Sequence, residues 1–276
     1  MWQPSEESRA MMGSKPADTV IEIRNVIKAF GGDQDSSRTL ALDGVNLTVN
    51  RGDLIGIVGP SGCGKSTLLN LVAGLEFFNG GEIFVEGQRV KGPREIGYVF
   101  QQDTLLPWRD VRGNAEFGLE IKGRDRQERW DVAQGWLKKL GLGKFHGHYP
   151  HQLSGGMRKR LQLSCILATE PNILLMDEPF GALDAQTRTL IEDDFLRLWR
   201  EAGLTVLFVT HDLSEAISMC TRVVIMSARP GRVKSEYSID LPRDLSTTDR
   251  KLQAQYHELF AQIWADLKDE VGQHLE

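Results

Sequence analysis

The sequence has few cysteines, no long hydrophobic run and no excess of positive charge, and each absence excludes a class of protein. Its 276 residues include three cysteines at unrelated spacings, without a CxxC motif, so we interpret them as free thiols of a reducing compartment. No apolar run approaches the roughly 18–20 residues that cross a bilayer, and the N-terminal segment lacks the hydrophobic core of a secretory signal. We therefore expect a cytoplasmic protein that reaches a membrane only through a partner.

The charge balance is acidic. Lysine and arginine number 33, against 38 aspartate and glutamate residues, which gives a net charge of −5. This balance argues against nucleic acid as the main partner, because binding to a phosphate backbone needs clustered positive charge. With 41% hydrophobic and 26% charged residues, the composition is that of a soluble globular protein, and the length allows one large domain or two small ones.

Short apolar runs alternate with helical patterns along most of the chain. Residues 1–18 are polar and aperiodic, which predicts a disordered tail. After this tail, the apolar patterns predict strands over 20–30, 40–50, 53–59, 81–90, 173–178, 205–211 and 222–228, and helices that include 66–75 and 188–201. Alternation of strands and helices indicates an α/β fold with a mostly parallel sheet and helices on both faces.

Two segments have only helical patterns. The stretch from about 102 to 168 has no clear strand, and the helical spacing of Trp130 and Trp136 predicts that they pack within a helical subdomain. Residues 242–276 are predicted to form a C-terminal helical extension. Its last helix, from about Arg250 to Val271, has one apolar face that consists of Leu252, Tyr256, Phe260, Ile263 and Leu267. That face could dock on the core of the same chain or on a second copy, and the sequence leaves both open.

A phosphate-binding motif occupies residues 59–66. It reads Gly59-Pro60-Ser61-Gly62-Cys63-Gly64-Lys65-Ser66 and matches GxxxxGK[ST], between a predicted buried strand and a predicted helix. Its glycines let backbone N–H groups turn around phosphate oxygens, and the helix presents its positive end to the same anion. In such a motif Lys65 reaches the β- and γ-phosphates and Ser66 coordinates Mg²⁺, while Thr67 can offer a hydroxyl to the α-phosphate.

Cys63 lies inside this loop, beside the helix N-terminus. Such an environment can depress the pKa of a thiol, which gives the hypothesis that alkylation of Cys63 blocks nucleotide binding. The alternative is that Cys63 is a small filler residue with incidental reactivity.

The segment ILLMDE, at 173–178, brings two carboxylates to the end of a predicted parallel strand. Parallel sheets bind their ligands at this edge. We expect Asp177 to hold the Mg²⁺ shell and Glu178 to polarise the attacking water. Alone, the pair could equally be charges at a helix N-terminus, but the phosphate-binding motif favours the catalytic interpretation.

A third motif, Leu153-Ser154-Gly155-Gly156-Met157, opens a basic helix and again combines a hydroxyl, two glycines and a helix N-terminus that suit an anion. Alone it would be a turn with a helix cap. With the other motifs, it makes the chain resemble the nucleotide-binding subunits of ATP-binding-cassette (ABC) transporters from about Val20 to Leu241. The resemblance implies an ABC ATPase domain over 19–241, a P-loop NTPase with a RecA-like core, an antiparallel β subdomain and a helical subdomain over about 102–168.

The resemblance also implies roles for single residues. Phe30 in KAFGG resembles the aromatic residue on which adenine stacks, and Gln101 in YVFQ resembles the Q-loop glutamine that contacts Mg²⁺ and the water. Asp184 in GALD resembles the D-loop aspartate that contacts the opposite subunit, and His211 in VTHD resembles the switch histidine at the γ-phosphate. Met157 replaces the glutamine most usual in the signature, a departure that we do not expect to abolish hydrolysis.

Partners follow from the same resemblance. In this family the signature of one subunit completes the P-loop site of another, which implies two ATP molecules with Mg²⁺ in a head-to-tail dimer, either of two copies or of two related chains. Transmembrane permease subunits and, indirectly, a periplasmic binding protein would place the chain on the cytoplasmic face of the inner membrane.

The stretches 99–120 and 226–233 resemble the ATPases of nitrate, sulfonate and taurine importers, which implies a small organic or inorganic anion as cargo. Two alternatives stay open. One is an ABC ATPase for another cargo class, such as lipid, and the other is a non-transport ABC ATPase that acts on nucleic acid or the ribosome.

Overall fold

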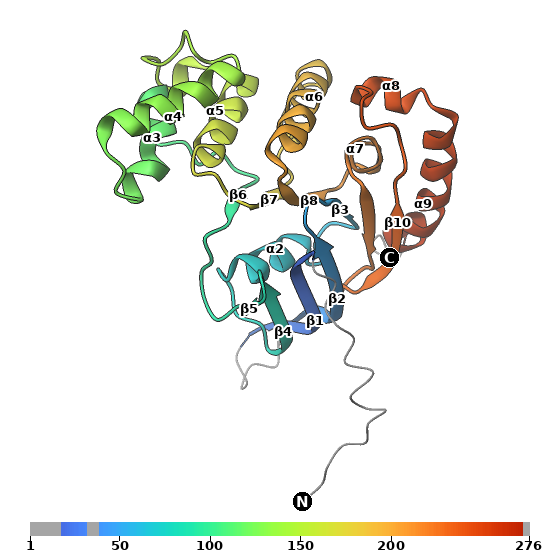
Figure 1. Cartoon of the computed structure of the whole chain (residues 1–276). Coiled ribbons are helices and arrows are strands. Elements are labelled where there is room, and N and C mark those ends of the chain that lie inside the picture. The colour runs from blue at the N-terminus through green and yellow to red at the C-terminus, as the bar shows by residue number, and fades with distance from the viewer. Residues whose placement is uncertain (1–17, 32–38, 273–276) are drawn as a thin grey trace, which may run out of the picture.

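The computed structural model describes residues 18–31 and 39–272, with side-chain surroundings up to residue 270. Figure 1 shows two sheets, with helices between and above them, and a group of helices that stands apart from the sheets. The disordered tail predicted for residues 1–18 lies, except for Asp18, outside the described residues. Within the described ranges, the helices are too short or too polar for any of them to cross a membrane.

The larger sheet has six strands in the order β10-β9-β3-β8-β7-β6, and all neighbours are parallel except β10 and β9. The strands are β3 (Leu54–Val58), β6 (Gly97–Val99), β7 (Ile173–Asp177), β8 (Thr205–Thr210), β9 (Arg222–Met226) and β10 (Val233–Ser238). The continuous apolar runs behind β3, β7, β8 and β9 are buried on both faces, as expected for central parallel strands. The predicted α/β fold with a mostly parallel sheet is confirmed.

The smaller sheet is antiparallel, with strand order β2-β1-β4-β5. Its strands are β1 (Thr19–Phe30), β2 (Thr39–Asn50), β4 (Gly80–Val85) and β5 (Gln88–Arg89). The prediction of one strand over 81–90 is wrong, because the chain reverses at Glu86 and Gly87 to form a hairpin of β4 and β5. Both turn residues have positive φ, 49° and 75°, as a tight two-residue hairpin turn requires.

Helix α2 (Lys65–Ala73) lies between the two sheets (Figure 1). Alternate side chains of β3 divide between two cores: Ile55 and Ile57 pack toward α2 and the antiparallel sheet, whereas Leu54 and Val58 pack toward the opposite face. That opposite face is covered by α6 (Ala185–Ala202) and α7 (Leu213–Met219). The end of β3 is thus fixed from both sides, directly before the phosphate-binding motif.

The group of helices that stands apart comprises α3 (Val111–Ile121), α4 (Arg126–Lys139) and α5 (Gly155–Leu167), with a short 3-10 turn, η1 (Pro150–Gln152), before α5. These helices share a cluster that includes Val111, Ala133, Leu137 and Leu161, separate from the cores of the sheets. Trp130 packs against that cluster as predicted, but the prediction is wrong for Trp136, which packs against the core of the larger sheet. The division at about 102 and 168 stays a prediction.

The C-terminal residues form two helices, α8 (Thr247–Lys251) and α9 (Ala254–Gly272). The prediction of one continuous helix from Arg250 is therefore wrong. Arg250 is buried and donates to the carbonyl oxygens of Pro242 and Ser218, which fixes α8 against the end of α7. Leu252 lies at the break and is 74% exposed. The rest of the predicted apolar face docks on the chain's own core, with Tyr256, Ile263 and Leu267 buried and Phe260 packed beside them.

Candidate nucleotide-binding site

The phosphate-binding loop joins the end of β3 to the start of α2. Gly62 and Gly64 have positive φ values of 74° and 101°, which glycine adopts without strain. Gly64 caps α2 with no side-chain hydrogen bond, so the N-terminal N–H groups of the helix are not satisfied by a cap. A side chain at Gly59 would place its Cβ 2.8 Å from the carbonyl oxygen of Met226. The loop can therefore cradle an anion at a helix N-terminus.

Lys65 is buried beneath this loop. Its Nζ donates to the carbonyl oxygens of Gly59 at 2.8 Å and Pro60 at 2.9 Å, which holds the ammonium at the loop. Cys63 is also buried, and burial raises the pKa of its thiol despite the opposing charge of Lys65. The expectation of a depressed thiol pKa is therefore wrong, because desolvation of Cys63 outweighs the charge of Lys65 and the hydrogen bonds to the sulfur.

Ser66 and Asp177 place a hydroxyl oxygen and a carboxylate oxygen next to each other in the site. The Ser66 hydroxyl donates to Asp177 Oδ1 at 2.9 Å, across the junction between α2 and β7. The pKa of Asp177 is raised above its usual value, chiefly by burial and also by the neighbouring charge of Glu178. The hydrogen bond from Ser66 opposes this rise only in part. In the described part of the chain, no three His, Cys, Asp or Glu side chains gather as a metal cage. One carboxylate and one hydroxyl suit Mg²⁺, which takes its remaining ligands from water and phosphates.

Three predicted catalytic residues meet at one carboxylate oxygen. Glu178 Oε2 accepts a hydrogen bond from Gln101 Nε2 at 3.1 Å and lies 3.2 Å from His211 Nδ1. Glu178 has a φ of 43°, a conformation that costs energy for a residue with a side chain. Its N–H donates to the carbonyl oxygen of Val209 at 2.9 Å, which ties the strained residue to β8. The loops after β6, β7 and β8 thus bring the carboxylate of Glu178 and the side chains of Gln101 and His211 together.

Phe30 lies in the same pocket as the phosphate-binding loop and Glu178. Phe30 is 40% exposed, and Lys28 Nζ lies 4.5 Å from the centroid of its ring. Lys28 is itself fixed by Glu76 at 2.8 Å and by the carbonyl oxygen of Phe77 at 2.7 Å. A pocket of about 270 Å³ connects the exposed ring to the phosphate-binding loop, and it is lined by Phe30, Ala41, Ser61, Gly62, Gly64, Lys65, Ser66, Thr67, Glu178 and Arg229.

Ala41 and Arg229 line this pocket but were not predicted from the sequence. They arrive from β2 and from the loop after β9, and neither stretch has a recognisable phosphate-binding pattern. The segment MSARPGRV, which contains Arg229, resembles one type of transporter ATPase, but its sequence alone does not indicate a contact with nucleotide.

The signature and D-loop residues lie outside this pocket. Ser154 is exposed and caps α5 by accepting from the N–H of Met157 at 3.3 Å, and Asp184 is exposed and caps α6 by accepting from the N–H of Thr187 at 2.9 Å. A Cβ on Gly156 would lie 2.5 Å from Thr187 Cγ2, so this glycine permits close packing of α5 on α6. Gly155 lines a second, smaller pocket with Gln101 and Glu178.

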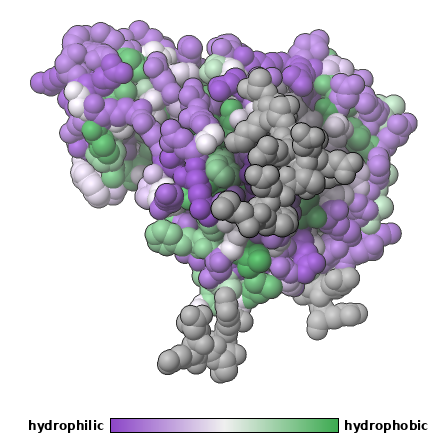
Figure 2. Space-filling model, turned by 60° about the horizontal axis from the view of Figure 1, so that its bottom comes forward, coloured by the Kyte–Doolittle hydropathy of each residue, from purple (hydrophilic) through white to green (hydrophobic). Residues whose placement is uncertain are grey.

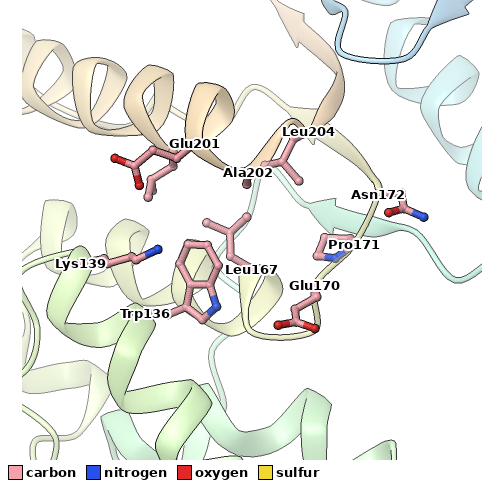
Figure 3. Close-up of a pocket in the computed structure, with 10 residues that line it drawn as sticks. Trp136, Lys139, Leu167, Glu170, Pro171, Asn172, Glu201, Ala202 and Leu204 are labelled. Atoms are coloured by element: carbon pink, nitrogen blue, oxygen red, sulfur yellow. The ribbon is translucent and has the colours of Figure 1, made fainter. Parts of the chain in front are cut away.

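A further pocket, of about 370 Å³, lies away from the nucleotide site between α4, the end of α5 and the end of α6. Figure 3 shows Trp136 and Lys139 on one side and Glu201 and Leu204 on the other. This pocket contains none of the phosphate-binding residues, so it has no part in the nucleotide site.

Comparisons with known proteins agree with this geometry. Residues 42–181 match the family model described as ABC transporter. An uncharacterized ABC transporter ATP-binding protein of Methanocaldococcus jannaschii is 44% identical over 93% of this chain and 94% of its own length. The taurine import ATP-binding protein TauB of Escherichia coli strain K12 is 44% identical over 81% of this chain and 86% of its own length.

Solved structures show the same fold. The dimeric structure of a bacterial ABC transporter cassette superposes with a TM-score of 0.70 at 34% identity, over 79% of this chain and 98% of its own. A post-hydrolysis state of the same cassette, bound to ADP and Pi, superposes equally well at 33% identity. The chain therefore belongs to the ABC transporter family, as an ATP-binding subunit and an ATPase that uses ATP with Mg²⁺.

Proposed function

We propose that this chain is the ATPase that powers an ABC importer for a small organic or inorganic anion of the nitrate, sulfonate or taurine type. The observation that carries the proposal is the 44% identity to a taurine import ATP-binding protein over 81% of the chain. The stretches 99–120 and 226–233, which resemble the same importer type, support it.

The geometry supports a separate role for each of the site residues toward adenine, phosphates, Mg²⁺ and the attacking water. Phe30 stacks on adenine, residues 59–64 and Thr67 bind the phosphates, and Lys65 supplies a cation at the phosphate chain. Ser66, Asp177 and Gln101 would hold Mg²⁺, which would neutralise charge on the phosphates. Glu178 accepts a proton from the attacking water, while Gln101 and His211 fix the orientation of its carboxylate.

A second subunit completes the site in this proposal. Ser154, Gly155 and Asp184 are exposed on the surface and line no part of the pocket at the phosphate-binding loop. Their exposure supports a head-to-tail dimer in which the signature of one subunit approaches the phosphates held by the other. The related cassette of known structure is a dimer.

The permease contact lies in the loop after Gln101. Trp108 is 71% exposed, and Leu106 lines a hollow of about 300 Å³ together with Phe117 and Ile166. An apolar groove of this kind accepts a short helix from a partner. We place the cytoplasmic coupling helix of the permease there, which puts the chain at the cytoplasmic face of the inner membrane, with a periplasmic binding protein as an indirect partner.

Affinity purification from solubilised membranes tests the proposal. The tagged chain carries Glu178→Gln, so that it keeps ATP bound. A matched control chain carries both Glu178→Gln and Lys65→Ala, so that it does not bind ATP. Recovery with Glu178→Gln of a multi-span permease, encoded beside a periplasmic binding protein, is the expected result. Recovery of ribosomal or DNA-repair proteins without a membrane protein would instead favour the non-transport ATPase.

The cargo class is tested in liposomes that hold the recovered permease and this chain. Taurine, an alkanesulfonate and nitrate are each added with the binding protein, and ATP hydrolysis is measured. One of these anions should stimulate hydrolysis several-fold. Stimulation by a lipid or by a cation alone would overturn the anion assignment and leave the ATPase site intact.

A further inference from the structure

The loop between β9 and β10, residues 227–232, packs directly on the phosphate-binding loop. A Cβ on Gly231 would lie 2.0 Å from the carbonyl oxygen of Cys63, so only glycine permits this approach. The N–H of Gly231 donates to the carbonyl oxygen of Ala41 at 2.9 Å, and its own carbonyl oxygen accepts from the N–H of Asp43 at 3.0 Å. The 227–232 loop is therefore fixed to β2 on one side and to the phosphate-binding loop on the other.

This loop brings Arg229 to the nucleotide pocket. Arg229 lines the pocket together with Lys65, and these two are the cations among the described residues that form its wall. The Arg229 Nε donates to the carbonyl oxygen of Leu40 at 3.3 Å, which sets the direction of the side chain. A guanidinium has five N–H donors in a planar fork, a shape that suits phosphate oxygens.

The same loop is held from the far side by α9. Glu270, near the C-terminal end of that helix, is buried, and its Oε2 accepts from the N–H of Ala228 at 2.8 Å. Its Oε1 pairs with Lys234 Nζ at 2.8 Å. Burial raises the pKa of Glu270, but the hydrogen bonds from Lys234 and Ala228 bring it below its usual value, so this carboxylate is charged at neutral pH. Figure 1 shows the end of α9 beside β10.

We propose that Arg229 binds the nucleotide phosphates and that Glu270 is its positioning residue, so that the C-terminal helix sets the affinity of the nucleotide site. The chain of contacts runs from Glu270 to the backbone of Ala228, and from the next residue, Arg229, into the pocket. The inference rests on the nucleotide site proposed above. It adds Arg229 to that site as a second cation and Glu270 as a residue outside the pocket that positions Arg229.

Calorimetric titration of the purified full chain with MgATP and with MgADP tests this inference. All variants carry Glu178→Gln to prevent turnover. Arg229→Ala should raise both dissociation constants about tenfold, the effect of losing a hydrogen bond to a charged group, whereas Arg229→Lys should raise them less. Arg51→Ala, which removes the same charge from an exposed site outside the pocket, should have no effect.

Glu270 is tested in the same titration. Glu270→Ala should weaken binding about threefold, because the loop loses its anchor, while Glu270→Gln keeps an oxygen for the N–H of Ala228 and should stay close to the parent. The exposed neighbour Asp269 offers a matched loss of charge as Asp269→Asn. In the double variant with Arg229→Ala, Glu270→Ala should cause no further loss, because it acts through Arg229.

The outcomes separate this inference from the proposed site. Unchanged affinity in Arg229→Ala overturns the role of Arg229, and an additive loss in the double variant overturns the positioning role of Glu270. Lys65→Ala is the reference for the site itself. If that variant binds MgATP as tightly as its parent, the nucleotide site as proposed fails. Arg229 is exposed, so its variants should fold even if Glu270→Ala does not.

Discussion

Replacing Glu178 by glutamine separates the chemistry of hydrolysis from nucleotide binding. Glutamine has the same shape, but it cannot accept the proton of the attacking water. In the native chain, Glu178 Oε2 lies 3.1 Å from Gln101 Nε2 and 3.2 Å from His211 Nδ1. A glutamine at this position keeps one oxygen that can accept from these two side chains. Loss of a positioned general base lowers turnover about 10²- to 10⁴-fold, which raises the barrier by about 3–5 kcal/mol.

Phosphate release at saturating ATP measures this loss, and a titration with MgATP shows whether binding is kept. Glu170 offers a matched control, because it is an exposed glutamate that also has positive φ, at 52°, and lies outside the nucleotide pocket. Glu170→Gln should therefore hydrolyse ATP at the parent rate. Turnover by Glu178→Gln within about threefold of the parent would refute the role of Glu178, and equal losses in both variants would point to backbone strain instead.

Three further predictions address binding, stability and pH. Lys65→Ala should weaken MgATP binding itself, measured by titration, with no change in the thermal midpoint beyond a few degrees. Ile263→Ala should lower the unfolding free energy by about 2–5 kcal/mol in urea, because Ile263 is fully buried on the face of α9 that packs on the core, whereas Trp264→Ala on the exposed side of the same helix should cost far less. Burial raises the pKa of Glu215 to about 8, against the hydrogen bond from Thr210 that lowers it. The folded chain therefore holds a proton that the unfolded chain releases, and stability falls as pH rises from about 4.5 to 8. Glu215→Gln should flatten that fall between pH 5.5 and 8, and an unchanged slope would contradict the assignment.

The sequence predicts those parts of the fold that depend on local pattern. Continuous apolar runs located β3, β7, β8 and β9, because strands buried on both faces need no polar positions. Strand β10, VKSEYS, was not predicted because it is an edge strand in which polar residues interrupt the apolar pattern, and its pairing with β9 is not encoded in that local pattern. The break between α8 and α9 depends on the burial of Arg250, a contact with Ser218 that no local pattern encodes.

The candidate site divides in the same way. The glycines of the phosphate-binding loop could be identified because adjacent residues form the whole cradle. The convergence of Gln101 and His211 on Glu178 depends on the order of the strands, which places β6, β7 and β8 side by side. Their individual roles came from resemblance to a family. Arg229 was missed because it enters the pocket from a loop distant in sequence, held by a helix more distant still.

The pocket drawn in Figure 3 also makes the chain suitable for optical experiments. Trp136 is half-buried there, with Lys139 Nζ 4.7 Å from the centroid of its ring, between α4 and the ends of α5 and α6. Emission from an indole depends on the water and charge around it. A change in the spacing of these helices during the ATPase cycle would therefore alter the fluorescence of Trp136. Steady-state and stopped-flow spectra, with Trp136→Phe as the blank, can follow such motion without an attached dye.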